Sequence, residues 1–221
     1  MSVGACLDTF SSSDEATAAL AAFGKSFVFP RTGLSAESIA LEFAEGSFLK
    51  PFARKTSGGS ELVARWLRVT LPKIAKSARY VINQGQFDIL VRRTGLDLLR
   101  FWREGVPDRR AKLSYGAAFR AVDLLFMALN ESSLDRSGFV QDLLHVPLEK
   151  ATLIPLRQCV DELVERDFSI EIPASPSPGF VSTEEHYVTL QEAIMALSER
   201  AGVPPIVYAY YCGISQQGSR N

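Results

Sequence analysis

Residues 113–130 read LSYGAAFRAVDLLFMALN, and residues 144–149 read LHVPLE after a polar connection. Large apolar side chains cover nearly every face of the first stretch, which predicts a helix at the centre of the fold. Arg120 and Asp123 are its two charged residues, and their spacing of three residues predicts an ion pair on one helical face. Pro147 and Glu149 suit the first turn of a later helix, where proline needs no N–H partner and an acid complements the helix dipole.

Apolar residues at helical spacing continue on both sides of this stretch. They predict two long helices, one from Ser60 to Val81 and one from Phe87 to Trp102. Pro72 should kink or split the first helix, because proline removes a backbone donor and clashes with the preceding turn. Gly95 could interrupt the second helix, and Pro155 should bend the helix that follows residue 149.

Sequence signals at both ends of the chain also indicate helices. Ser11–Glu15 and Thr183–Glu185 combine capping hydroxyls with acids in the first turn, as helix starts do. Gly24 and Gly202 are suitable helix ends, because glycine adopts the left-handed conformation that often closes a helix. No strand pattern is evident, and we therefore expect an all-α fold with about nine or ten helices.

Length and composition bound the organisation of the chain. A chain of 221 residues, of which 47% are hydrophobic and 22% charged, is typical of a globular protein with a sizeable core. We expect one all-α domain over residues 1–214, with an alternative of two helical subdomains divided near residues 105–113. The polar residues 215–221 are expected to form a disordered tail.

Several classes of site are not predicted. Cys6, Cys159 and Cys212 lie far apart without a Cys-x-x-Cys pair, and two histidines are too few for a typical zinc centre. Phosphate-loop, dinucleotide, HExxH and GxSxG motifs are missing, so no cofactor or metal is expected. The chain also has no run of eighteen apolar residues and no signal-peptide pattern at its start, which predicts a cytoplasmic protein without a membrane span.

Charge is distributed unevenly along the chain. Lys50–Lys112 contains 15 Lys and Arg against 5 Asp and Glu, whereas the other residues contain 9 basic and 20 acidic ones. Such a basic segment can bind the phosphates of a nucleic acid, or it can face the acidic part of this chain or an acidic protein partner. A solvated helix face is a further alternative. The residues expected to contact nucleic acid are Arg65, Arg68, Lys73, Lys76, Arg92, Arg93, Arg109 and Arg110.

The central stretch carries a resemblance to a known superfamily. Gly116-Ala117-Ala118-Phe119-Arg120-Ala121 and Val146-Pro147-Leu148-Glu149 resemble the motif of the helix-hairpin-helix DNA glycosylases, over about 40 of the 221 residues. The stretch is also similar to bacterial proteins with a Gly-x-Ala-x-Lys helix followed by His-Val-Pro-x-Asp. The resemblance implies an all-α fold, Gly116 at the hairpin, Arg120 at the lysine position and Glu149 at the catalytic aspartate position.

The departures from that motif bear on activity. Arginine is always protonated and cannot attack a sugar as a neutral amine, so Arg120 excludes Schiff-base lyase chemistry at this position. Glu149 keeps the negative charge of an aspartate but is longer by one methylene, which shifts the carboxylate relative to a bound sugar. Ala118 replaces the second glycine of the hairpin, where a close backbone approach to a phosphate would be needed.

Three functions remain compatible with these residues. The chain could be a monofunctional glycosylase in which Glu149 acts as general base or stabilises the developing cation. It could instead bind nucleic acid without base excision, with Tyr115, Phe119 or Trp102 stacking on a base. The alternative is a helical interaction subunit of a bacterial complex, in which the charged surfaces contact protein partners.

Overall fold

A computed structural model describes residues 10–30, 38–39, 43, 47–108, 110–131, 139–164, 170–177 and 179–213. Within these ranges the chain forms nine α-helices and two short 3₁₀ helices, and it contains no β-strand. The predicted all-α class is confirmed. The predicted tail at 215–221 and Arg109 lie outside the described residues.

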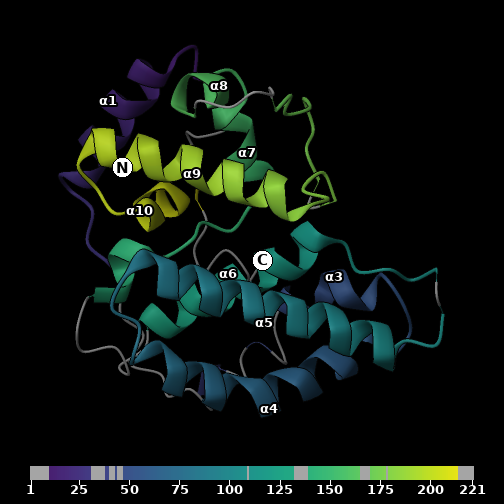
Figure 1. Ribbon diagram of the computed structural model, residues 1–221. Helices are drawn as coiled ribbons and strands as arrows, with labels where there is room; N and C mark the ends of the chain where they lie inside the picture. Colours follow the sequence, from purple (N-terminus) through teal and green to yellow (C-terminus); the bar gives the residue numbers. More distant parts are fainter. Residues whose placement is uncertain are drawn as a thin grey trace.

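The helices are arranged in two layers, the lower of which is drawn in blue and teal in Figure 1. This layer contains the 3₁₀ helix η1 (Ser47–Leu49) and the helices α3 (Lys50–Ala53), α4 (Gly59–Ala78), α5 (Gln84–Gly105) and α6 (Tyr115–Glu131). A short connection joins α4 to α5, and the Trp66 indole N–H donates to Asp97 Oδ2 at 2.9 Å near the middle of both helices. The two helices therefore form an antiparallel hairpin.

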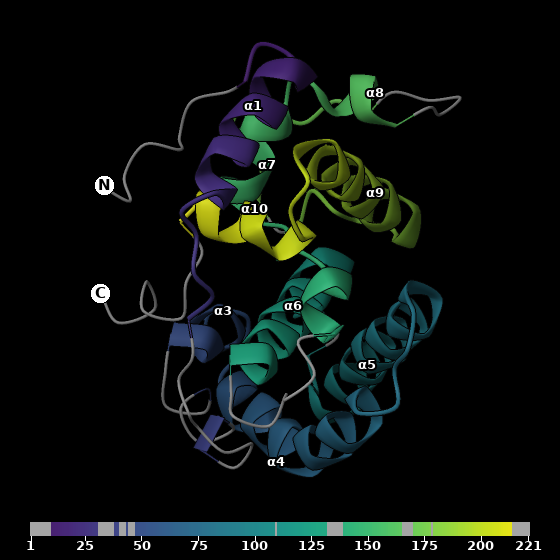
Figure 2. The same cartoon turned by 90° about the vertical axis from the view of Figure 1, so that its left-hand side faces the viewer.

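The upper layer combines the first described helix with the last ones. It contains α1 (Ser13–Gly24), α7 (Lys150–Leu156), α8 (Val160–Leu163), α9 (Glu184–Ala201) and α10 (Pro205–Tyr211). Figure 2 shows α1 beside α10 and α9, against both of which it packs. The 3₁₀ helix η2 (Phe139–Leu143) lies on the connection from α6 into this layer. The chain thus runs from one layer into the other and back again.

The predicted helix ends are confirmed where a local cap determines them. The side chain of Ser12 accepts from the backbone N–H of Glu15 at the start of α1, at 3.3 Å. Thr183 accepts in the same way from His186 at the start of α9, at 3.2 Å. Gly202 ends α9 with φ +67°, a left-handed conformation that glycine adopts without steric cost.

Three expectations about helix breaks are corrected by the structure. At Pro72 the expected split is wrong, because α4 continues through it with the buried neighbours Leu71 and Ile74 on both sides, while the alternative of a kink stays a prediction. Gly95 does not interrupt α5. The helix after residue 149 does not merely bend at Pro155, since α7 ends at Leu156 and a turn closed by Cys159 N–H to Leu156 O (3.0 Å) precedes α8.

The predicted central helix is α6. Its side chains Phe119, Val122 and Leu125 are at most 1% exposed, and it packs closely against α5. Gly95 permits this approach, because a Cβ atom built there would lie 2.5 Å from the ring of Phe119. Ser114 caps α6 by accepting from the N–H of Ala117 at 3.3 Å. None of the described helices is both long and apolar enough to cross a membrane.

Candidate functional site

The structure brings together Arg120 and Glu149, the two residues singled out for catalysis. Arg120 Nε on α6 donates to Glu149 Oε2 at the start of α7 at 2.5 Å, and the guanidinium Nη2 contacts the same oxygen. The side chains are 23% and 24% exposed. The expected ion pair between Arg120 and Asp123 is wrong, because Arg120 pairs with Glu149 and Asp123 Oδ1 accepts from the Tyr187 hydroxyl at 2.7 Å.

Glu149 also has a structural position at the end of a helix. It is the N-cap residue of α7, and the hydroxyl of Thr152 accepts from its backbone N–H at 3.0 Å. Its carboxylate is engaged by a guanidinium, which neither accepts a proton nor acts as an amine nucleophile. The pair therefore links α6 to α7 and provides no route to a Schiff base.

The glycine and aromatic candidates are mostly enclosed by the fold. Gly116 N–H donates to the carbonyl of Val181 at 2.8 Å, so this donor is already used within the protein. Phe119 and Trp102 are 1% and 2% exposed and cannot stack on a base without leaving the core, which corrects their expected role. Tyr115 is half-buried and stacks on Phe119 with ring centroids 4.1 Å apart. Burial raises the pKa of its hydroxyl.

A groove of about 990 Å³ lies between α4 and α5. Both helices supply cations to it, together with aliphatic side chains. The charged residues that line it are Lys73, Arg92, Arg93, Arg100, Arg103 and Asp97. Lys73, Arg92 and Arg93 belong to the set expected to contact nucleic acid, whereas Arg65, Arg68, Lys76 and Arg110 do not line this groove.

Two of the groove cations have acidic partners. Arg92 Nε donates to Glu184 Oε1 on α9 at 2.5 Å, and this bond raises the pKa of the guanidinium. Arg100 Nη2 lies 2.5 Å from Asp97 Oδ1. Within the described ranges Lys73, Arg93 and Arg103 have no ion-pair partner, and all three are exposed. The groove therefore keeps a net positive charge.

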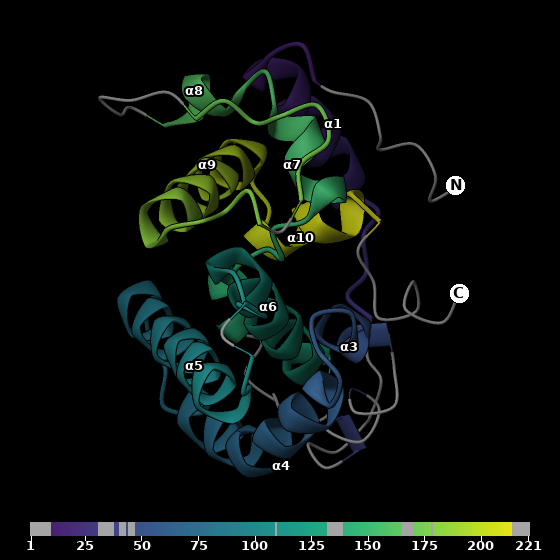
Figure 3. The same ribbon diagram turned by 90° about the vertical axis from the view of Figure 1, so that its right-hand side faces the viewer.

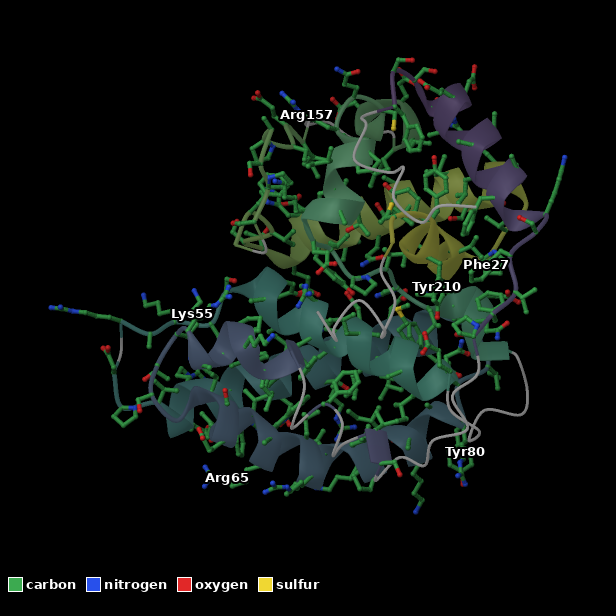
Figure 4. All side chains as sticks on the ribbon, turned by 180° about the vertical axis from the view of Figure 1, so that it is seen from behind. Phe27, Lys55, Arg65, Tyr80, Arg157 and Tyr210 are labelled. Carbon is green, nitrogen blue, oxygen red and sulfur yellow. The ribbon has the colours of Figure 1, made fainter. Side chains whose placement is uncertain are left out.

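The surrounding cations extend this charge over the outer surface of the hairpin. Arg65 lies on the outside of α4 (Figure 4), with its guanidinium carbon 5.5 Å from the centre of the Phe101 ring. Arg68 and Lys76 are also exposed on α4. Arg110 is exposed beyond the end of α5, where its backbone N–H donates to Asp108 Oδ1 at 2.8 Å.

Exposed aliphatic and aromatic side chains gather on the same hairpin, a feature that the sequence reasoning missed. Among the described residues seven large hydrophobic side chains are exposed, and five of them lie between residues 69 and 96. They are Val69, Tyr80, Ile82, Ile89 and Leu96. Ile89 and Leu96 both line the groove, and Arg93 lies between them at helical spacing. That spacing of 89, 93, 96, 100 and 103 was the available signal for one shared face.

Comparisons with protein-family models, with curated proteins and with solved structures give no match for this chain. The interpretation of the groove and of the Arg120–Glu149 pair therefore depends on their own geometry. Within the described ranges no group of three or more His, Cys, Asp or Glu side chains is placed to hold a metal ion.

Proposed function

We propose that the protein binds nucleic acid through the α4–α5 groove, on a helical fold of the DNA-glycosylase type. The observation that supports this most directly is a set of exposed cations along one groove, Lys73, Arg93 and Arg103, which have no ion-pair partner among the residues that the structure describes. Phosphate contacts by Lys and Arg supply most of the sequence-independent affinity of a nucleic-acid-binding protein. Arg92 and Arg100 would hold the groove in shape through Glu184 and Asp97.

We further propose that binding occurs without base excision. Glu149 does not line the groove, and its carboxylate is held by Arg120. A general base must reach the attacking water, and a nucleophilic amine must lose its proton. The Glu149 carboxylate is already bonded to Arg120, and the Arg120 guanidinium does not lose its proton, so neither condition is favoured.

The test is the double substitution Arg93→Glu/Arg103→Glu, compared with Lys150→Glu/Arg157→Glu. Both variants change the net charge equally, and all four residues are exposed. Lys150 and Arg157 lie at the ends of α7 in the other layer, where Figure 4 marks Arg157 at the periphery. Binding of a labelled duplex and a labelled single strand would be titrated over a range of salt concentrations.

The groove variant should lose about 100-fold or more in affinity at low salt, and its logarithmic salt slope should fall by about 2. The α7 variant should stay close to the original protein. Equal losses in both variants, or no binding by the original protein at low salt, would show that the groove is not a nucleic-acid site.

Base release provides a separate test of catalysis. Duplexes that contain alkylated, deaminated or oxidised bases would be incubated with the protein and with its Glu149→Gln variant. We expect neither protein to release a base above the uncatalysed rate. Release by the original protein that Glu149→Gln abolishes would make the chain a monofunctional glycosylase, contrary to the proposal.

The exposed hydrophobic side chains support a second candidate, an acidic amphipathic segment of a protein partner in the same groove. Apolar contacts with Ile89 and Leu96 would contribute to such a complex and hardly at all to phosphate binding. The variant Ile89→Ser/Leu96→Ser separates the two candidates. If this variant binds nucleic acid with an affinity changed by less than about threefold, the result agrees with phosphate contacts. A large loss of affinity would indicate that the groove binds its ligand through apolar contacts.

A further inference from the structure

A continuous chain of hydrogen bonds connects the surface to a fully buried carboxyl group. His145 Nε2 lies 2.9 Å from Asp88 Oδ1, His145 Nδ1 lies 2.9 Å from the Tyr187 hydroxyl, and that hydroxyl lies 2.7 Å from Asp123 Oδ1. We call these four residues the proton chain. Gln84 Nε2 also donates to Asp88 Oδ1, at 2.8 Å.

The proton chain joins the two layers of the fold. Asp88 belongs to α5, Asp123 to α6 and Tyr187 to α9, while His145 follows η2. Figure 3 shows α9 above α6 and α5, so the contacts cross between the layers. The Asp88 side chain is 49% exposed, whereas His145, Tyr187 and Asp123 are 7%, 3% and 1% exposed.

The donors and acceptors of this chain set the smallest number of protons that satisfies its three bonds. An ionised Asp88 only accepts, so its bond to His145 Nε2 requires a proton on Nε2. Gln84 Nε2 also lies 3.3 Å from His145 Nε2, and its two protons then go to Asp88 Oδ1 and to the carbonyl of Leu143. If His145 is neutral, its Nδ1 accepts from the Tyr187 hydroxyl, which can then no longer donate to Asp123. Asp123 would in that case have to be protonated on Oδ1 and donate to the Tyr187 oxygen, which reverses the bond in the structure, where the Tyr187 hydroxyl donates.

A second arrangement satisfies the same three bonds with the same number of protons. The Asp123 proton passes to the Tyr187 oxygen while the Tyr187 proton passes to His145 Nδ1, which leaves an imidazolium and an ionised Asp123. With one proton fewer, the single Tyr187 proton cannot serve both neighbours, and one buried bond is lost. One proton more can sit on Asp123 Oδ2, which has no hydrogen-bond partner among the described residues, and the three bonds then remain.

From this geometry we infer that His145, Tyr187 and Asp123 form a buried proton-binding site that controls the contact between α6 and α9. One proton completes the site, and its loss breaks a hydrogen bond between the layers. The ligand of the site is the proton itself, with Asp88 as its solvent-facing end. This inference does not depend on the nucleic-acid proposal.

The burial of Asp123 favours a proton at this position. Asp123 Oδ2 is buried without a hydrogen-bond partner among the described residues, and the nearby Arg120 on the same helix is held by Glu149. Burial raises the pKa of Asp123 well above its ordinary value, against the opposing effects of the Tyr187 bond and of Arg120. Burial, followed by the charge of Asp123, also raises the pKa of Tyr187.

The remaining ionisable groups lie further along the site. Tyr115 of α6 lies beside Tyr187, with ring centroids 6.1 Å apart, and its buried hydroxyl has no hydrogen-bond partner in the described part of the chain. Glu184 of α9 and Arg92 of α5 influence Tyr115 and form an ion pair with each other. Burial opposes ionisation of Asp88, but the bonds from His145 and Gln84 together outweigh it and lower the pKa of Asp88.

The direction of the pH dependence follows from these shifts. Because the pKa of Asp123 is higher in the folded state, its contribution to stability is present at low pH and is lost as pH rises through the folded pKa. The pKa of Asp88 is lower in the folded state, so its contribution is lost as pH falls. The contact between α6 and α9 should therefore be most stable at an intermediate pH.

The test compares melting temperatures across pH for the full chain and for two variants. Asp123→Asn keeps both a donor and an acceptor beside Tyr187 but carries no titrating proton. Gln191→Leu is the matched control, because Gln191 bonds the backbone N–H and carbonyl of Val146 at 3.0 and 2.8 Å, one residue from His145, without any titrating group.

The melting temperature of the original protein should fall, relative to Asp123→Asn, by about 4 °C or more as pH rises from its optimum. Gln191→Leu should lower the melting temperature at every pH without flattening the profile. Parallel profiles for the original protein and Asp123→Asn would overturn the proton site.

A measurement on the unchanged protein covers the case in which Asp123→Asn does not fold. The ¹⁵N resonances of the His145 ring, assigned against a His186→Gln variant, report which nitrogen carries a proton. At the pH of greatest stability Nε2 should be protonated, with Nδ1 either accepting or sharing its proton with Tyr187. A ring protonated on Nδ1 alone would reverse the order of donors and would also overturn the inference.

Discussion

Gly95→Ala should lower the free energy of unfolding by about 1–3 kcal/mol, although alanine is normally the better helix former. The new Cβ atom would lie 2.5 and 2.6 Å from two ring carbons of Phe119. That ring is 1% exposed and stacks against Tyr115, so it has little room to retreat. The substitution should therefore push α5 away from α6. Urea unfolding monitored by circular dichroism measures the loss.

Gly85→Ala is the control, because Gly85 belongs to the same helix. A Cβ atom there meets only Asn83 Oδ1, at 3.7 Å, and we expect a gain of up to about 0.5–1 kcal/mol. Combining Gly95→Ala with Phe119→Leu should cost less than the sum of the single losses, since the smaller side chain leaves space for the methyl group. If Gly95→Ala proved as stabilising as Gly85→Ala, the close α5–α6 contact would be wrong.

Arg120→Met should cost about 2–3 kcal/mol of stability at neutral pH. Removing one partner of a fully buried ion pair costs about 3–5 kcal/mol, and the loss should be smaller here because solvent reaches both side chains. The exposed fractions of 23% and 24% leave the Glu149 carboxylate largely enclosed once its cation is gone. Chemical unfolding of the variant provides the value.

A double-mutant cycle separates the ion pair from the packing of the arginine stem. Glu149→Gln removes the charge at the other end but keeps an acceptor at the start of α7. The variant with both substitutions should be more stable than the sum of the single losses predicts, by about 1–2 kcal/mol. Additive losses would mean that Arg120 and Glu149 contribute independently, and the pair would then not link α6 to α7.

Sequence alone predicted the features that neighbouring residues determine. The caps Ser12, Thr183 and Gly202 each act within one helical turn, so their residue types were sufficient. The central place of α6 followed from its apolar faces. The same reasoning should have placed Phe119 in the core, and the expected stacking of that ring on a base conflicted with it.

Contacts between distant segments could not be predicted in the same way. Helical spacing predicted Asp123 as the partner of Arg120, because such spacing identifies only neighbours within one turn of the same helix. Glu149 lies 29 residues away, and only the fold of the chain brings its carboxylate within 2.5 Å of Arg120 Nε. Tyr187 was not singled out at all, since a lone tyrosine on an amphipathic helix resembles any other core residue.

The groove combines residues that share one helix, which the sequence can predict, with a residue from a second helix, which it cannot. Arg93, Arg100 and Arg103 share one face of α5, and their spacing was visible in the sequence. Lys73 joins them because α4 returns antiparallel to α5, which depends on contacts such as the bond between Trp66 and Asp97. The nucleic-acid role of these residues stays a prediction until binding is measured.

The packing of α1 against α9 and α10 has a consequence for the order of folding. During synthesis α1 leaves the ribosome roughly 160 residues before α9. Its side chains Ala16 and Leu20 therefore cannot be buried against α9 and α10 until those helices have been synthesised. The hairpin of α4 and α5 needs no such delay, because its contacts are local in sequence. Chains halted after α6 should therefore have a folded α4–α6 layer and an unstructured α1 that is accessible to proteases and chaperones.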